Sequence, residues 1–369
     1  MEGVDVRVPL LDVTRIPHAL QAELEARAVA VLRSGEYILG PEVTAFERAC
    51  AATLEVPHAI GVSNGSDALL MLLMALGIGP GDEVIVPSYT FFATAGAVAR
   101  LGATPVFVDS QPETLNLDPA CVAEAITNRT RAIIPVHLFG LPADLGALRR
   151  VAGELPLLED AAQAFLARYE GRPVGGIGLA GAFSFFPSKN LGGYGDGGLL
   201  TTHDHGLAER LRVLRAHGSQ PKYHHAVVGG NFRLDALQAA LLSVKLPHVS
   251  SEIAGRRANA ARYVTLLADD PRLQLPPATP EHTFNQFVVR FADRATRDHV
   301  QRALSNAQVG TAVYYPVPLH QQECFATAGE AARCPVAEHA AETSLALPVF
   351  AALRPEELDY VVTSLRNAL

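Results

Sequence analysis

The sequence has few cysteines, no long apolar run and no basic stretch, and each absence excludes a class of protein. Its four cysteines lie far apart without a C-x-x-C pair, so we expect reduced, buried or incidental thiols at Cys50, Cys121, Cys324 and Cys334. No segment offers the roughly 18 uninterrupted apolar residues that a membrane span needs. The start, MEGVDVRVPLLDV, lacks the apolar stretch of a signal peptide. We therefore expect a cytoplasmic protein without a membrane partner.

The charge balance also argues against nucleic acid as a partner, because the net charge is −8 and no long basic run occurs. Apolar residues make up 49% of the chain and charged residues 18%, which predicts a large core and little disorder. The 369 residues are enough for about two domains of ordinary size. The chain contains no internal repeat and no low-complexity tract.

Several common ligand-binding motifs are absent as well. The stretch SNGSDALL at residues 63–70 has no G-K-[ST], which excludes a P-loop, and no G-x-G-x-x-G, which excludes a dinucleotide fingerprint. His217, His224 and His225 lie in one segment, but they include no helix-spaced H-x-x-x-H and no cysteine lies near them. We therefore expect no metal site.

Short apolar runs alternate with amphipathic helical stretches over the first part of the chain. We expect strands at 59–62, 83–87, 104–108, 132–136, 155–158, 182–186 and 198–202. We expect helices at 17–34, from Pro41, and at 66–76, 92–101, 118–126, 143–153 and 205–216. This order predicts an α/β fold with a mainly parallel sheet covered on both faces. The last two strands are joined by a glycine turn without a helix, which would let one of them run antiparallel.

The remainder of the chain has a different pattern. One or two long helices are expected at 234–268, kinked or divided near Pro247. A strand at 287–291, a helix at 295–305, a strand at 309–315 and a terminal helix at 355–368 follow. We therefore divide the chain into a large domain, 1–246, which includes the N-terminal helices, and a small α+β domain, 247–369.

Two motifs could hold a planar phosphorylated ligand. Asn64, Gly65 and Ser66 follow a strand and open a helix, whose free N–H groups and positive dipole end favour a phosphate; an ordinary helix cap is the alternative. Phe91 and Phe92 follow the next strand, where ligands of open α/β sheets bind, so one ring could stack on a flat ligand. Core packing would explain either ring equally well.

Two further motifs carry titratable groups. The run PLLEDAAQAF ends a strand in Glu159 and Asp160, which period-two alternation points to opposite faces, and Gln163 follows three residues later. A buried carboxylate needs a partner, often a cation, although Asp160 could instead cap a helix. Lys189 lies between the apolar run that contains Ser184 and a glycine-rich turn, where desolvation would make a nucleophilic amine.

The alternative for Lys189 is an ordinary solvated surface lysine. Together, however, the motifs supply a phosphate seat, a stacking ring, an acid for a ring nitrogen and an imine-forming lysine. This is the set of groups that pyridoxal 5'-phosphate requires from a protein.

The motifs SNGSDAL, PSYTFFATA, EDAAQAF, FSFFPSKNLGGYGDGG and NFRLDALQAA jointly resemble the DegT–StrS family of pyridoxal-phosphate sugar-nucleotide aminotransferases. The resemblance covers nearly the whole chain. It implies the aspartate-aminotransferase type I fold, with a mixed, mostly parallel sheet in the large domain. It also implies an amino-group transfer from L-glutamate to a keto-sugar nucleotide.

The resemblance assigns a role to each matched residue. Lys189 would be the Schiff-base lysine and proton carrier, and Asp160 would pair with the pyridine nitrogen. Gln163 would contact the ring hydroxyl and Phe91 would stack on the ring. The phosphate would be held by Gly65, Ser66 and Ser184. A dehydratase branch of the family has histidine in place of the lysine, so Lys189 disfavours that branch.

The resemblance further implies a homodimer with shared active sites. Asn231 and Arg233 would reach the neighbouring site and contact the cofactor phosphate or the carboxylate of the amino donor. Tyr314 and Tyr315 match a stretch that lines the sugar pocket. Ser66 stands where threonine is common in the family, and Phe232 where a small residue is common; neither departure touches the chemistry.

The acceptor is the least determined part of the expectation. The glycine-rich run and the segment PKYHH…GGNFRLD look more like members acting on 3-keto than on 4-keto sugar nucleotides. The run Lys222, Tyr223, His224 and His225 resembles enzymes for UDP-linked 2-acetamido-3-keto sugars and could meet the diphosphate, although a solvated loop fits equally well. A 4-keto sugar nucleotide or a keto-cyclitol stays open as acceptor, as does a regulatory or sensory cofactor-binding relative.

Overall fold

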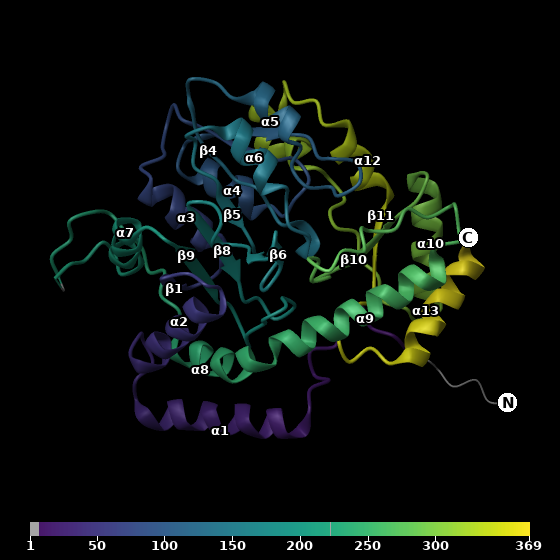
Figure 1. Ribbon diagram of the computed structural model, residues 1–369, viewed down its shortest axis with the longest axis horizontal. Coiled ribbons are helices and arrows are strands. Elements are labelled where there is room, and N and C mark those ends of the chain that lie inside the picture. The colour runs from purple at the N-terminus through teal and green to yellow at the C-terminus, as the bar shows by residue number, and fades with distance from the viewer. Residues whose placement is uncertain (1–6, 222) are drawn as a thin grey trace.

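The computed structural model describes residues 7–221 and 223–369, and its centre is a sheet built from two ladders (Figure 1). The first ladder runs β1-β9-β8-β5 and the second runs β3-β2-β4. Single bridges from Ile133 to Leu157 and from Val136 to Asp160 join the two ladders. The strands are β1 His58–Val62, β2 Glu83–Pro87, β3 Thr104–Val108, β4 Thr130–Ile133, β5 Leu158–Asp160, β8 Ala180–Ser184 and β9 Gly198–Thr202.

The pairing directions follow from the connections. β2 pairs parallel with β3 and β4, and β5 pairs parallel with β8, each through a crossover. β9 pairs antiparallel with both β1 and β8, so the strand after the glycine turn is the antiparallel one. The expectation of one antiparallel strand next to a parallel sheet is therefore confirmed, and so is the α/β fold class.

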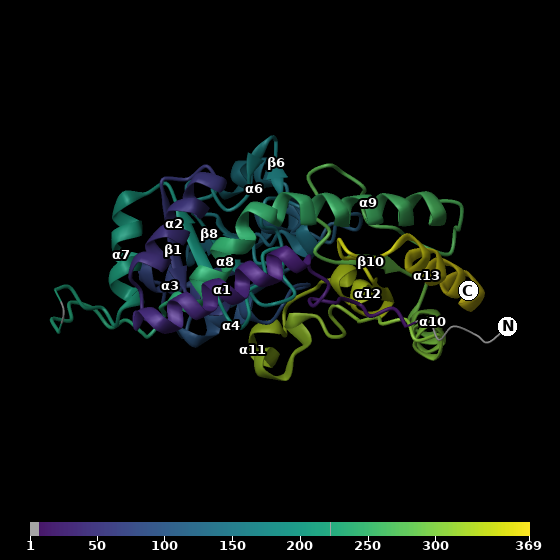
Figure 2. The ribbon, with the colours of Figure 1, turned by 90° about the horizontal axis from the view of Figure 1, so that it is seen from below.

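Helices cover both faces of this sheet (Figure 1). Alternation along β8 sends Ala180 and Ala182 into the cluster under α3, α4 and α7, and sends Phe183 into the cluster under α2 and α8. α1 packs on α8 (Figure 2). The helices are α1 His18–Ser34, α2 Pro41–Thr53, α3 Gly65–Ala75, α4 Ala93–Arg100, α5 Pro119–Ala125, α6 Leu145–Ala152, α7 His205–Arg215 and α8 Ala236–Lys245.

The C-terminal part has its own apolar cluster around a two-stranded antiparallel sheet of β10 and β11. α9 starts in the cluster of the large sheet and ends in this one, so the division after residue 246 stays a prediction. The elements are α9 Val249–Leu267, β10 Phe287–Arg290, α10 Arg294–Asn306, α12 Pro335–Thr343, β11 Ser344–Leu347 and α13 Pro355–Ala368. Short elements complete the chain: β6 Arg168–Tyr169, β7 Arg172–Pro173, η1 Leu138–Gly140, η2 Leu246–His248, η3 Leu319–Gln321, η4 Glu323–Phe325 and α11 Ala326–Gly329.

The expected strand at 309–315 is wrong. That segment makes only isolated bridges, from Val309 to Val8 and from Ala312 to Ala346. Pro316 and Pro318 follow directly, and prolines lack the N–H group that a ladder needs. The partner of β10 is instead β11, a four-residue run directly after a helix.

Pro247 divides the long helical stretch between α8 and α9, as expected. Within the described residues, no helix has both the length and the apolar character to cross a membrane.

Gly198, the first residue of β9, is predicted to be required for close packing. A Cβ added there would lie 2.6 Å from the backbone carbon and oxygen of Asn64, so Gly198→Ala must push the start of α3 away. Overpacking of this kind lowers the free energy of unfolding by about 1–3 kcal/mol, measurable by urea denaturation. Gly79→Ala is the matched control, since its Cβ would meet nothing nearer than 4.0 Å. Equal stabilities for the two variants would contradict the prediction.

Candidate active site

A cavity of about 400 Å³ lies at the carboxyl ends of the sheet strands. Ligands of open α/β sheets bind at this edge, because the strand ends and the helix starts meet there. Nine of the residues proposed from the sequence line this one cavity: Gly65, Ser66, Phe91, Asp160, Gln163, Ser184, Lys189, Tyr314 and Tyr315.

Lys189 lies five residues after the end of β8, in a turn. Its backbone N–H donates a hydrogen bond to the carbonyl of Phe186. Its side chain is partly buried and faces the cavity. Burial lowers the pKa of its ammonium group from 10.5 to about 8, and the carboxylate of Asp160 opposes this shift. A large fraction of the amine is therefore neutral near pH 8, as a nucleophile requires.

Asp160 ends β5 and is 5% exposed. Its Oδ2 accepts a hydrogen bond of 2.8 Å from the hydroxyl of Thr94, and its Oδ1 accepts one of 3.2 Å from the N–H of Ala162. Burial raises the pKa of Asp160, whereas these two bonds and the charge of Lys189 lower it. A buried carboxylate in this position would gain from a cationic ring nitrogen as a further partner.

The start of α3 forms the floor of the cavity. Asn64 caps the helix by accepting from the N–H of Asp67 at 2.8 Å, while the first-turn residues Gly65 and Ser66 line the cavity. The first N–H groups of a helix have no partner within it, so they suit a phosphate. A Cβ on Gly65 would lie 2.8 Å from the Cβ of Ser184, so glycine is what allows α3 to approach the end of β8.

Aromatic side chains and the amide of Gln163 form another part of the cavity wall. Gln163 accepts from the N–H of Phe139 at 2.6 Å and donates to the hydroxyl of Tyr315 at 3.1 Å. The ring of Tyr315 lies 6.2 Å from that of Phe91. Phe91 is 54% exposed, which leaves it free to cover a flat ligand.

Comparison with known proteins identifies this arrangement. The sequence profile of the DegT/DnrJ/EryC1/StrS aminotransferase family matches residues 18–366. This chain belongs to that family. Its expected enzyme class, an aminotransferase, and its expected cofactor, pyridoxal phosphate, are thereby confirmed.

Individual relatives match over nearly their full length. The UDP-N-acetyl-3-dehydro-alpha-D-glucosamine 3-aminotransferase of Acidithiobacillus ferrooxidans is 44% identical over 98% of both chains. The dTDP-3-amino-3,4,6-trideoxy-alpha-D-glucose transaminase of Streptomyces venezuelae is 47% identical over 95% of this chain and 94% of its own. A protein of Geobacillus stearothermophilus named pleiotropic regulatory protein is 47% identical over 97% of both chains.

The fold agrees with solved structures. The crystal structure of DesV from S. venezuelae superposes with a TM-score of 0.93, at 46% identity and over 98% of both chains. The type I transferase fold expected from the sequence is therefore confirmed.

The residues of the cavity fit pyridoxal phosphate as the family's cofactor. The phosphate would lie at the start of α3 with Ser184 beside it, and the ring would lie between Phe91 and the wall of Gln163. Asp160 would face the ring nitrogen, and Lys189 would face the carbonyl carbon. Only glycine at position 65 lets the start of α3 lie this close to Ser184, so both residues can reach one phosphate.

Four further proposed residues that the structure describes, Asn231, Arg233, His224 and His225, do not line this cavity in the single chain. Asn231 is exposed, and its backbone pairs with Ala216. Arg233 pairs through its backbone with Val62, and its buried Nε has no hydrogen-bond partner among the described residues. His224 and His225 are exposed on the segment between α7 and α8, which projects from the body in Figures 1 and 2. Lys222 lies outside the described residues.

Sequence reasoning missed Thr94 and Gln286. Thr94 is fully buried against the carboxylate of Asp160, and Gln286 reaches the cavity from the start of β10. A signal for Thr94 existed, since a threonine stands in the first turn of an otherwise apolar helix. Gln286 comes from a distant part of the chain, and no local pattern places it here.

The lowered pKa of Lys189 can be measured directly, because the chain has only three lysines, Lys189, Lys222 and Lys245. We expect the ¹³C-dimethyl-lysine NMR signal of Lys189 in the cofactor-free protein to titrate near pH 8. Asp160→Asn should move this midpoint to lower pH, because the carboxylate charge raises the pKa of Lys189. The Lys189→Ala variant assigns the signal. A midpoint at the ordinary value of 10.5 would contradict the buried position.

Proposed function

We propose that this protein transfers the amino group of L-glutamate to a 3-keto sugar nucleotide, with a UDP-linked 2-acetamido-3-keto sugar as the first candidate. The observation that carries the amino-transfer chemistry of the proposal is that Lys189 and Asp160 line one cavity together with the first turn of α3, close enough for their charges to interact. The product would be an amino sugar for a surface polysaccharide, lipid A or a glycosylated natural product.

Each residue would contribute one step to this reaction. Pyridoxal phosphate, when bound, supplies the carbonyl that takes up the amino group and an electron sink for the charge released at carbon. Asp160 keeps a proton on the ring nitrogen, because a buried carboxylate stabilises the adjacent cation. Lys189, with its pKa near 8, takes the proton from the carbon that carries the amino group and returns it in the second half of the reaction.

The names of two relatives support the 3-position of the acceptor, since each is named for a 3-amino or 3-keto sugar. They differ in the nucleotide, one being UDP-linked and the other dTDP-linked. The acetamido sugar is favoured by the sequence run at 222–225, which resembles that of enzymes for UDP-linked 2-acetamido-3-keto sugars. A 4-keto sugar nucleotide or a keto-cyclitol is the alternative acceptor.

A regulatory role is the second candidate function, and the name of one 47% identical relative favours it. The complete set of lysine, acid and phosphate seat weighs against a protein without turnover. Because one protein can combine catalysis with regulation, the two functions are distinguished by measuring turnover itself.

The acceptor prediction is tested with four substrates, UDP- and dTDP-linked 3-keto and 4-keto sugars. We expect glutamate alone to change the visible absorbance of the holoenzyme, and 3-keto acceptors to restore it faster than 4-keto acceptors. Lys189→Ala should reduce turnover by at least about 10²-fold to 10⁴-fold, the usual contribution of a positioned proton carrier. Faster reaction with the 4-keto sugars would overturn the 3-position, and no reaction with glutamate would overturn the proposed amino donor.

We further propose a homodimer in which Asn231 and Arg233 complete the partner's site. The two residues do not line the cavity of their own chain, and they lie at the base of the segment between α7 and α8, where the backbone of Asn231 pairs with Ala216 and that of Arg233 with Val62. In a two-fold dimer, each chain would place Asn231 and Arg233 at the active site of the other chain.

Subunit mixing tests this arrangement. Lys189→Ala and Arg233→Ala should each be nearly inactive. After dissociation and mixing in equal amounts, about a quarter of wild-type activity should return, because half of the dimers are mixed and each holds one intact site. Mixing Lys189→Ala with Asp160→Ala is the control and should recover no activity, since one chain supplies both residues to the same cavity and every site of a mixed dimer therefore keeps one of the two changes. A self-contained site would give no recovery in either mixture.

A further inference from the structure

Glu159 is a fully buried carboxylate that the reaction does not use. It precedes Asp160 on β5, so its side chain points to the opposite face of the strand. It is 0% exposed. Its two oxygens accept four hydrogen bonds, from His137 Nε2 at 3.0 Å, Gly175 N at 2.6 Å, Ile177 N at 2.7 Å and Gly178 N at 2.6 Å.

Three of these donors come from one tight turn before β8. Gly175 has φ +85°, a conformation that glycine adopts without strain. A Cβ on Gly178 would lie 2.4 Å from the carbonyl oxygen of Leu157, so only glycine allows the turn to approach β5. Successive N–H groups that converge in this way form an anion-binding nest, and the anion here is the side chain of Glu159.

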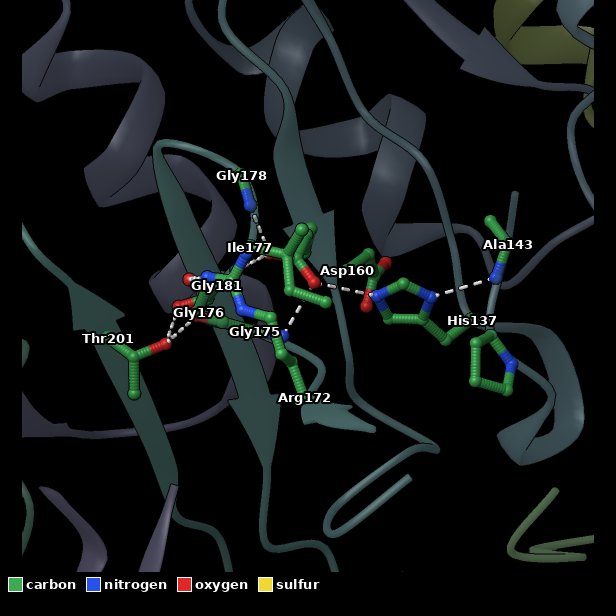
Figure 3. Close-up of polar contacts among 12 residues, drawn as sticks. His137, Ala143, Asp160, Arg172, Gly175, Gly176, Ile177, Gly178, Gly181 and Thr201 are labelled. Atoms are coloured by element: carbon green, nitrogen blue, oxygen red, sulfur yellow. Dashed lines mark hydrogen bonds and ion pairs between the residues drawn. The ribbon is translucent and has the colours of Figure 1, made fainter. Parts of the chain in front are cut away.

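The fourth donor is a histidine whose tautomer follows from its contacts. The Nδ1 of His137 accepts from the N–H of Ala143 at 3.0 Å, so its Nε2 carries the hydrogen that is donated to Glu159. The backbone N–H of His137 also donates to the carbonyl of Asp160 at 3.0 Å. Figure 3 shows His137 on one side of Asp160 and the turn at 175–178 on the other.

The bonds keep Glu159 ionised. Burial raises the pKa of Glu159. The hydrogen bonds from His137, Gly175 and Gly178 lower it by more than burial raises it, so the pKa lies below the usual range. The carboxylate therefore links three segments: the chain after β4 and the end of β5, which border the cavity through Val136 and Asp160, and the turn that leads into β8. β8 in turn leads to Ser184 and Lys189.

We propose that Glu159 is a positioning residue, whose buried carboxylate fixes the end of β5 so that Asp160 faces the ring nitrogen of the cofactor. This inference rests on the cofactor site described above, but it does not depend on which keto sugar is the acceptor. Glu159 acts through the backbone and through His137, and it touches neither cofactor nor substrate.

Glu159→Gln is the sharpest test, because the amide keeps the shape but replaces one acceptor oxygen with a donor that faces other donors. We expect the folded variant to bind pyridoxal phosphate about 10-fold to 100-fold more weakly, the usual cost of losing a residue that orients a ligand-holding group. We expect kcat for the half-reaction with glutamate to fall more than KM changes. The pH titration of the cofactor absorbance should also shift, since the ring nitrogen loses its aligned acid.

A double-variant cycle separates positioning from general stability. If Glu159 acts through Asp160, Glu159→Gln should weaken cofactor binding much less in an Asp160→Asn background than in the wild type. Glu154→Gln, the same change at an exposed position in the loop before β5, is the matched control and should bind the cofactor normally. His137→Asn is the second variant if Glu159→Gln does not fold, since it removes one of four donors and should weaken binding in the same direction.

The proposal is overturned if the folded variants lose thermal stability but keep wild-type cofactor affinity and absorbance titration, or if the two changes weaken binding additively. Both readouts use the cofactor and glutamate alone. A failure of every keto sugar would therefore count against the proposed acceptor and leave the role of Glu159 intact.

Discussion

The electrostatic interaction of Lys189 with Asp160 across a low-polarity cavity is the constraint on which the site depends. Burial pushes the lysine towards the neutral form and the carboxylate towards the protonated form, while each charge favours the ionised form of the other. Each group therefore offsets part of the cost that burial imposes on the charge of the other. Together they hold an amine near its working pKa opposite an acid, and this balance is what a carbanion-stabilising cofactor requires from its protein.

The sheet places Asp160 and the phosphate end of the cavity directly, and it places Lys189 through the short turn after β8. Asp160 is the last residue of β5, Ser184 is the last residue of β8, and Gly65 opens the helix that follows β1. Their mutual positions are therefore set by strand pairing, which tolerates little displacement. Glycines at 65, 178 and 198 allow the backbones to approach more closely than any side chain would permit. On the other face of β5, the carboxylate of Glu159 accepts four hydrogen bonds and so fixes the strand further.

Much of this was predictable from the sequence, because the signals are local. The apolar strand before Asp160, the glycine-rich turn after Lys189 and the proline start of α13 each occupy a few consecutive residues. The strand at 309–315 was predicted wrongly, since alternation alone cannot show that a partner strand is missing. Thr94 was missed although a threonine in the first turn of an apolar helix is a local signal. Gln286 was missed because its position in the site arises from packing between distant segments. The roles proposed for Asn231 and Arg233 require a second chain, which the fold of one chain does not determine.

The most direct test of the account is a crystal structure of the protein with pyridoxal phosphate and the amine product of a UDP-linked 2-acetamido-3-keto sugar. We expect the ring nitrogen within hydrogen-bond distance of the Asp160 carboxylate, the cofactor phosphate at the N–H groups of Gly65 and Ser66, and the amine at position 3 of the sugar directed towards the cofactor beside Lys189. A cofactor bound elsewhere, or one whose ring nitrogen faces away from Asp160, would contradict the assignment of this cavity as the active site.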